Sequence, residues 1–192
     1  MDFKKLWDQR KIGTYQDIEL PDGTVLEGWR HSEKTWDQIK WIPFKNKIIL
    51  DIGPFHAYFL IKAVQAGAKE CYGIDLNVGA LGEGEIKTLY VAKEIVKKWK
   101  FNNIYLIIAD WMFSPIKNKV DIILCFNTAH YFHNINKGIE DMFKISKEWI
   151  IFQVMHHIVP IIYRYCNKYN FKVEKEIIGT WNQRPILFCR KV

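Results

Sequence analysis

The chain has 192 residues, 49% of them apolar, and its 28 lysines and arginines exceed its 21 acidic residues to give a net charge of +7. This composition predicts one packed core and leaves little room for long disordered segments. No apolar run reaches the ~18 residues of a membrane span, and the N-terminus lacks the apolar segment of a signal peptide, so we expect a cytoplasmic protein with no membrane partner. The positive charge favours RNA or an anionic substrate as partner and does not decide between them.

The first 45 residues do not follow the alternation of strands and helices found in the rest of the chain. Within them, Pro21-Asp22-Gly23 separates two short apolar runs and predicts a hairpin. Ser32 is the predicted cap of a helix that reaches about Trp41. We therefore divide the chain into an N-terminal extension, residues 1–45, that acts as a lid or substrate cover, and a main domain, residues 46–192.

From Lys47 onward, short continuous apolar runs alternate with helical patterns, as expected for parallel strands covered by helices on both faces. The predicted strands are 47–51, 71–75, 104–108, 121–126, 149–154, 171–178 and 185–190. The predicted helices are 55–66, about 84–99, 136–147 and 158–169. Between the third and fourth strands, the helix is absent or reduced to 112–118. Residues 179–184 are too few for a crossover helix, so the last two strands form an antiparallel hairpin. The pattern predicts an α/β fold with a seven-stranded, mostly parallel sheet.

The four cysteines are widely separated, and three of them fall in apolar runs that suit a small buried thiol. No Cys-x-x-Cys spacing occurs, and the adjacent His156 and His157 do not make a metal site, because successive side chains diverge. We therefore predict no metal ion, and we expect four buried thiols: Cys71, Cys125, Cys166 and Cys189.

Acidic residues stand at the carboxyl ends of the first two strands of the main domain. Asp51 ends the first strand and precedes Gly53, and Asp75 ends the second. Glycine at such a turn allows a ligand to approach the backbone closely, and a carboxylate at a strand end can accept hydrogen bonds from hydroxyl groups. This unit predicts half of a nucleotide-binding fold.

With these residues, the chain resembles the class I S-adenosylmethionine-dependent methyltransferases, which have a Rossmann-like sheet with a reversed last hairpin. The family's Asp-x-Gly-x-x-x-Gly motif falls on Asp51, Gly53 and Ala57. Its second acidic residue, which takes the ribose hydroxyls, falls on Asp75, and its residue beside the adenine falls on Asp110. The resemblance implies S-adenosyl-L-methionine as cofactor and these cofactor-binding residues: Asp51, Gly53, Phe55, Ala57, Asp75, Leu76, Asp110, Trp111 and Asn127.

The turn after the first strand departs from the family pattern, because Pro54-Phe55-His56-Ala57 replaces a glycine-rich stretch. A Cβ at Ala57 is tolerable at negative φ and costly at positive φ. His56 could point into the cofactor pocket or cap the following helix. A catalytically degenerate protein that binds a nucleotide-like ligand or a partner therefore stays open as an alternative. A dehydrogenase is disfavoured, because Gly-x-Gly-x-x-Gly is absent.

The fourth strand is followed by Asn127, His130 and Tyr131, and residues at this place face the crevice of such sheets. We predict these three as catalytic residues, with His130 as a base whose unperturbed pKa is ~6.5. Short words such as Gly28-Trp29 and Gly67-Ala68-Lys69 are similar to the enzymes that modify the wobble uridine of transfer RNA. The methyl acceptor is therefore predicted to be an RNA base, possibly in transfer RNA, or a small molecule, and the oligomeric state is left open.

Overall fold

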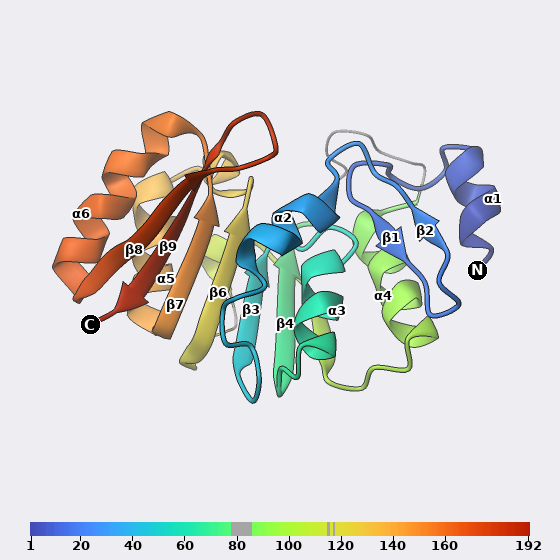
Figure 1. Ribbon diagram of the computed structural model, residues 1–192, viewed down its shortest axis with the longest axis horizontal. Coiled ribbons are helices and arrows are strands. Elements are labelled where there is room, and N and C mark those ends of the chain that lie inside the picture. The colour runs from blue at the N-terminus through green and yellow to red at the C-terminus, as the bar shows by residue number, and fades with distance from the viewer. Residues whose placement is uncertain (78–85, 115, 117) are drawn as a thin grey trace.

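The computed structural model describes residues 1–77, 86–114, 116 and 118–192, and its centre is a seven-stranded sheet (Figure 1). The strand order is β5-β4-β3-β6-β7-β9-β8, and β9 alone runs opposite to the other six strands. The strands are β3 (Ile48–Ile52), β4 (Glu70–Asp75), β5 (Ile104–Ile108), β6 (Val120–Phe126), β7 (Ser146–Gln153), β8 (Phe171–Ile178) and β9 (Pro185–Lys191). The predicted α/β fold with its C-terminal antiparallel hairpin is confirmed.

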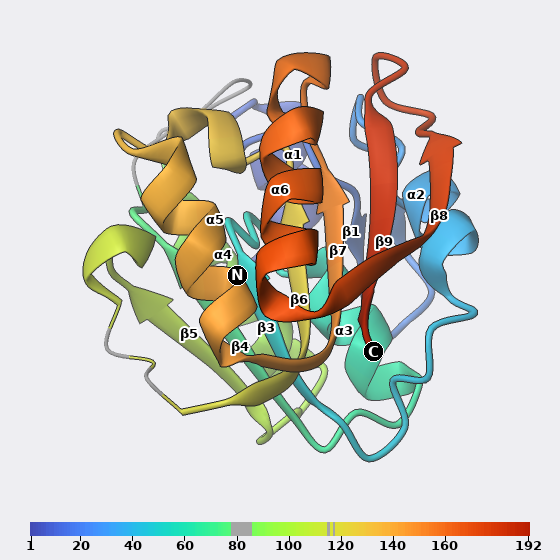
Figure 2. The same cartoon turned by 90° about the vertical axis from the view of Figure 1, so that its left-hand side faces the viewer.

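Helices cover both faces of the sheet, so the protein has a core on each face. Successive residues of a strand point to opposite faces and therefore belong to different cores. Ile49 belongs to one core and Leu50 to the other. The first core is completed by helices α2 (Ser32–Ile39), α3 (Tyr58–Gln65) and α4 (Thr88–Lys98), and the second by α5 (Ile135–Ile145) and α6 (Val159–Tyr169). Figure 2 shows α5 and α6 on one side of the sheet and α2 on the other.

Several element boundaries differ from the predicted ones. Helix α3 begins at Tyr58, three residues later than expected, because Phe55 and Ala57 have left-handed backbone angles that a helix cannot contain. The predicted start of the next helix, near residue 84, lies outside the described residues, and α4 begins at Thr88. Between β5 and β6, the described residues form a single 3-10 turn, η1 (Trp111–Phe113), which agrees with the expected loss of a helix there.

The N-terminal extension contains a helix that the sequence analysis missed, α1 (Phe3–Asp8). Its signal was present, since Asp2 caps it by accepting a hydrogen bond from the backbone N–H of Lys5 at 3.1 Å. The predicted hairpin is formed by β1 (Ile18–Glu19) and β2 (Val25–Leu26). No described helix is both long and apolar enough to cross a membrane.

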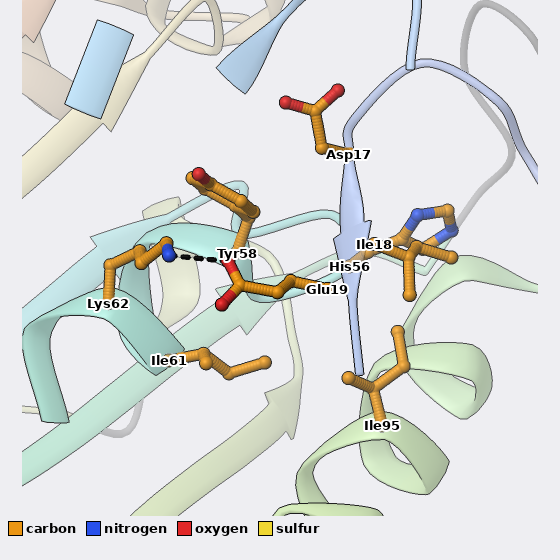
Figure 3. A pocket seen from close by; sticks show the side chains of 8 residues that line it. All are labelled: Asp17, Ile18, Glu19, His56, Tyr58, Ile61, Lys62 and Ile95. Atoms are coloured by element: carbon orange, nitrogen blue, oxygen red, sulfur yellow. Dashed lines mark ion pairs between the residues drawn. The ribbon is translucent and has the colours of Figure 1, made fainter. Parts of the chain in front are cut away.

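The hairpin packs against α3 and α4, as Figure 3 shows. Glu19 forms an ion pair with Lys62 of α3, and its carbonyl oxygen accepts a hydrogen bond from the indole of Trp99 at 2.9 Å. The cavity between them measures about 10 Å³, which is room for about one water molecule. This junction therefore anchors the extension and does not hold a ligand.

Candidate functional site

A cavity of about 690 Å³ opens at the carboxyl ends of the parallel strands, within the range of about 300–1,000 Å³ typical of ligand pockets. Its wall contains the residue that follows β3, Gly53, and the one that ends β4, Asp75. It also contains Asp110 after β5 and Asn127 after β6. The strand order reverses at β3, and such switch points are where open α/β sheets bind ligands.

Gly53 cannot be replaced by another residue without strain. Its φ is +78°, in the region that favours glycine, and a Cβ there would overlap the hydroxyl group of Thr128. The backbone of β3 therefore comes close to the loop after β6, and both residues line the cavity.

The turn that departs from the family pattern still adopts glycine-like backbone angles. Phe55 has φ +53° and Ala57 has φ +65°, so the condition under which a Cβ at Ala57 is costly is met. The Phe55 ring lines the cavity, whereas Ala57 is fully buried at the start of α3. His56 does not line this cavity; it borders the small cavity beneath the hairpin, where Figure 3 shows it beside Ile18, and burial lowers the pKa of its imidazole to about 3.

Asp75 and Asp110 form the acidic end of the cavity. One oxygen of each accepts a hydrogen bond from a backbone N–H two residues later, that of Asn77 at 2.8 Å and that of Met112 at 2.8 Å. Burial raises the pKa of Asp75. The second oxygen of Asp110 lies 3.4 Å from Nε2 of His133 at the edge of the cavity. Each aspartate thus both shapes a turn and borders the cavity.

The opposite end of the cavity contains a chain of hydrogen bonds between two arginines. Arg30 donates to Oε1 of Gln153 at 2.8 Å, and the same oxygen accepts from Nδ2 of Asn127 at 3.1 Å. Oδ1 of Asn127 in turn accepts from Arg184 at 2.9 Å. Asn127 is held with φ +57°, so the residue after β6 is fixed by both its backbone and its side chain.

Arg30 is only 3% exposed, and its guanidinium packs against the rings of Tyr15, Phe59 and Phe126. Its Nε has no hydrogen-bond partner among the described residues. Asp51 is 1% exposed, and its Oδ2 atom also has no hydrogen-bond partner among the described residues. Burial raises the pKa of Asp51 to about 7, although the charge of Arg30 acts in the opposite direction. Two buried groups of opposite charge therefore lie close to the cavity with unused hydrogen-bonding capacity.

Four aromatic rings from separate segments meet at the basic end. The ring of Tyr15 lies edge-on to those of Trp29, Phe55 and Trp181, with centroids 5.1, 5.3 and 5.7 Å away. Trp29 and Trp181 also contact each other, at 5.0 Å. The N-terminal extension and the connection between β8 and β9 thus meet over the strand ends, where Figure 1 shows that connection.

The cavity brings together most, but not all, of the residues predicted from the sequence. Those that line it are Gly53, Phe55, Asp75, Leu76, Asp110, Trp111, Asn127 and Tyr131. Asp51, Ala57 and His130 are not among the lining residues. His130 lies beside Tyr131, and burial, reinforced by the charge of Arg184, lowers the pKa of its imidazole to about 4.

Sequence reasoning did not select five residues of the basic end: Tyr15, Trp29, Arg30, Trp181 and Arg184. A partial signal existed, since Gly28-Trp29-Arg30 is an unusual word in a polar segment and residues 179–184 exceed the length of a tight hairpin turn. Gln153 was detectable as the one polar residue of the predicted strand 149–154.

No protein-family model matches the sequence, and no curated protein matches it. Solved structures do match. A ribosomal protein L11 methylase from Lactobacillus delbrueckii subsp. bulgaricus superposes with a TM-score of 0.65 at 18% identity, over 91% of this chain and 86% of that one. A candidate RNA methyltransferase from Pyrococcus horikoshii has a TM-score of 0.66 at 16% identity, over 98% of each chain.

A third match is a magnesium protoporphyrin IX methyltransferase from Synechocystis PCC 6803 with bound S-adenosylmethionine. Its TM-score is 0.64 at 15% identity, over 84% of this chain and 77% of that one. The fold is that of the class I S-adenosylmethionine-dependent methyltransferases. At these identities the likeness describes the fold, and the chemistry has to be argued from the cavity.

Proposed function

We propose that this chain is a methyltransferase that uses S-adenosyl-L-methionine. The observation that carries the proposal is the alignment of Gly53, Asp75 and Asp110 at the ends of three adjacent strands around one cavity. The cofactor carries an adenine, two ribose hydroxyls and a methionine end, and this cavity offers carboxylates and a close backbone approach in the matching order.

The residues present fit the cofactor at each of its parts. Asp75 would accept hydrogen bonds from the ribose hydroxyls, and Asp110 with Trp111 would border the adenine. The methionine end carries both a carboxylate and an ammonium group. Arg30, which lines the cavity, would hold the carboxylate, and its unpartnered Nε supports that role. Asp51 does not line the cavity, but it lies close enough to interact with Arg30 and Asp75, so it would act on the ammonium group through its charge.

When bound, S-adenosylmethionine supplies a methyl group that is open to attack by a nucleophile. The protein's part is to align the acceptor with that group and to exclude water. Asn127 and Tyr131 are the proposed catalytic residues, because both line the cavity and the conformation of Asn127 is fixed by its hydrogen bonds. His130 is not retained in this proposal, because it does not line the cavity.

The acceptor, an RNA base or a small molecule, would enter at the end formed by Tyr15, Trp29 and Trp181. The net charge of +7 suits an anionic acceptor of either class, and one of the structural neighbours is a candidate RNA methyltransferase. Similarity to the transfer RNA wobble-uridine enzymes stays a prediction. A cytoplasmic location is supported by four free cysteines, because disulfides are rare in reducing compartments.

Calorimetric titration with S-adenosylmethionine and S-adenosylhomocysteine tests the proposal. We expect binding of both, and we expect Asp75→Ala to raise the dissociation constant at least about tenfold, because hydrogen bonds to a charged group contribute about 1.5–3 kcal/mol each. Asp37→Ala is the matched control, since Asp37 is an exposed carboxylate paired with Lys40 on α2. If neither S-adenosylmethionine nor S-adenosylhomocysteine binds at millimolar concentration, the proposed methyltransferase function is refuted.

The catalytically degenerate protein is the second candidate. Its support is Phe55, a bulky residue in a turn where the family is rich in glycine. It predicts that adenosine or a nucleotide binds to the cavity while S-adenosylmethionine does not, so the same titration with adenosine separates the two functions.

A further inference from the structure

The two ends of the cavity carry opposite charges. Asp75 and Asp110 follow β4 and β5, on one side of β3 in the sheet, whereas Arg30 and Arg184 contact residues at the ends of β6 and β7, on the other side. A ligand that fills the cavity would therefore place hydroxyl or cationic groups at the first end and an anionic group at the second.

Arg184 lacks a counterion in the described part of the chain. Its guanidinium donates to the neutral amide oxygen of Asn127 at 2.9 Å, and none of the ion pairs among the described residues includes it. Arg30, which is 3% exposed, is assigned above to the carboxylate at the methionine end of the cofactor. Arg184 is therefore the positive group left for an acceptor at this end.

The wall beside Arg184 is aromatic. Three aromatic residues line the cavity here: Tyr15, Trp29 and Trp181. Their rings pack edge-to-face against one another, and this packing holds them in fixed orientations. Such a wall favours a planar ligand over a flexible aliphatic one.

Among the described residues that line the basic end, none carries a carboxylate or an imidazole that could remove a proton from an acceptor. Their side chains are aromatic rings, amides, a threonine hydroxyl and guanidinium groups, and the carboxylates and His133 of the lining lie at the acidic end. An acceptor that is already an anion at neutral pH, such as a carboxylate, needs no such base.

We propose that the methyl acceptor is a planar small-molecule carboxylate that stacks against Tyr15, Trp29 and Trp181 and pairs with Arg184. This inference rests on the proposed methyltransferase function. One carboxylate oxygen forms a bond to the methyl carbon while the bond between that carbon and the sulfonium sulfur breaks. The electron pair of the broken carbon–sulfur bond stays on sulfur. The carboxylate and the sulfonium both become neutral, the products are a methyl ester and a thioether, and no proton is released.

The test uses methyl-labelled S-adenosylmethionine with benzoate or 2-naphthoate, and with 2-naphthamide as the uncharged analogue. Alkali cleaves a methyl ester and releases volatile labelled methanol, whereas methyl groups on RNA bases stay attached. We expect alkali-labile label with the carboxylates and none with the amide. We also expect 2-naphthoate to bind the S-adenosylhomocysteine-loaded protein at least about tenfold more tightly than 2-naphthamide.

Arg184→Gln should remove this preference, with the cofactor dissociation constant unchanged within about twofold. Arg164→Gln is the matched control, because Arg164 is an exposed arginine of α6 that also donates to an amide oxygen, that of Asn136. Equal binding of naphthoate and naphthamide, or alkali-stable label on added transfer RNA, would overturn the inference. If S-adenosylmethionine itself does not bind in the same calorimeter, the proposed function fails, and the two failures are thereby distinguished.

Discussion

The acidic and basic ends of the cavity are built in different ways. The acidic end consists of residues at strand ends, Gly53, Asp75 and Asp110, whose positions follow from the order of the parallel strands. The basic end is assembled from the N-terminal extension, the loop after β6 and the connection between β8 and β9. The end that we propose for most of the cofactor is thus local to the sheet, and the end that we propose for the acceptor comes from distant segments.

The largest effect is expected at the acidic end, from Gly53→Ala. The new Cβ would contact Thr128 and hold a positive φ, so we expect a loss of about 2–5 kcal/mol in the free energy of unfolding, together with loss of cofactor binding. Urea denaturation measures the first effect and calorimetry the second. Gly23→Ala is the control, because Gly23 has φ +84° and a Cβ added to it would have no neighbouring atom within 4 Å, so it reports backbone strain alone. Equal losses in both variants would mean that Thr128 moves aside at no cost.

Asp51 is a buried carboxylate that interacts with the charge of Arg30 at the basic end and with that of Asp75 at the acidic end. The variant Asp51→Asn tests the effect of its own charge. The folded protein holds the proton of Asp51 up to a pKa of about 7, whereas the unfolded chain releases it near pH ~3.9. The folded state thus binds the extra proton between these values, and the contribution of Asp51 to stability falls as the pH rises from about 4 to 7. At pH 8 the asparagine variant should be more stable by about 2–4 kcal/mol.

The measurement is urea denaturation of both proteins from pH 4 to 8. His56 acts in the opposite direction over an overlapping range, because its pKa is lowered to about 3 and its contribution is lost as the pH falls below about 6.5. The difference between wild type and variant cancels the His56 contribution. A difference that does not change with pH would contradict the raised pKa of Asp51.

Trp181→Ala sharpens the comparison from the basic end. It removes the ring that contacts Tyr15 and Trp29, so binding of 2-naphthoate should weaken about tenfold, while S-adenosylmethionine binds within about twofold of wild type. Calorimetry with each ligand measures both constants. Tyr90→Ala, at an exposed aromatic residue of α4, is the control. Equal weakening of both ligands would show that the two ends do not bind independently.

The smallest effect is expected from Ala57→Gly. Relief of the strain at φ +65° should raise the free energy of unfolding by about 1–2 kcal/mol. Loss of a buried methyl group and the greater entropy of the unfolded chain should offset most of this gain, so the stability changes little. Ala63→Gly in α3 removes an equally buried methyl from a helical position and should destabilise by about 1–2 kcal/mol. Thermal unfolding of both variants gives the difference, and equal losses would argue against strain at Ala57.

The order of strands and helices from residue 47 onward was readable because each strand is a short apolar run and each helix has its own periodicity. The missed helix α1 shows the limit of this method, since a short helix with one cap resembles a loop in its composition. The backbone geometry of the turn at 54–57 could not be predicted either, because phenylalanine and alanine do not favour the left-handed angles that Phe55 and Ala57 adopt.

The amino-acid sequence by itself determined the sheet, its reversed last hairpin and the residues at the strand ends that form the acidic end of the cavity. Those features depend on periodicity and on neighbours in the chain. Only the tertiary structure decided that Arg30 and Arg184 share one end of the cavity with four aromatic rings, and that His130 lies outside its wall. Contacts between segments more than a hundred residues apart depend on how the extension and the last hairpin pack on the sheet, and no local pattern encodes that packing.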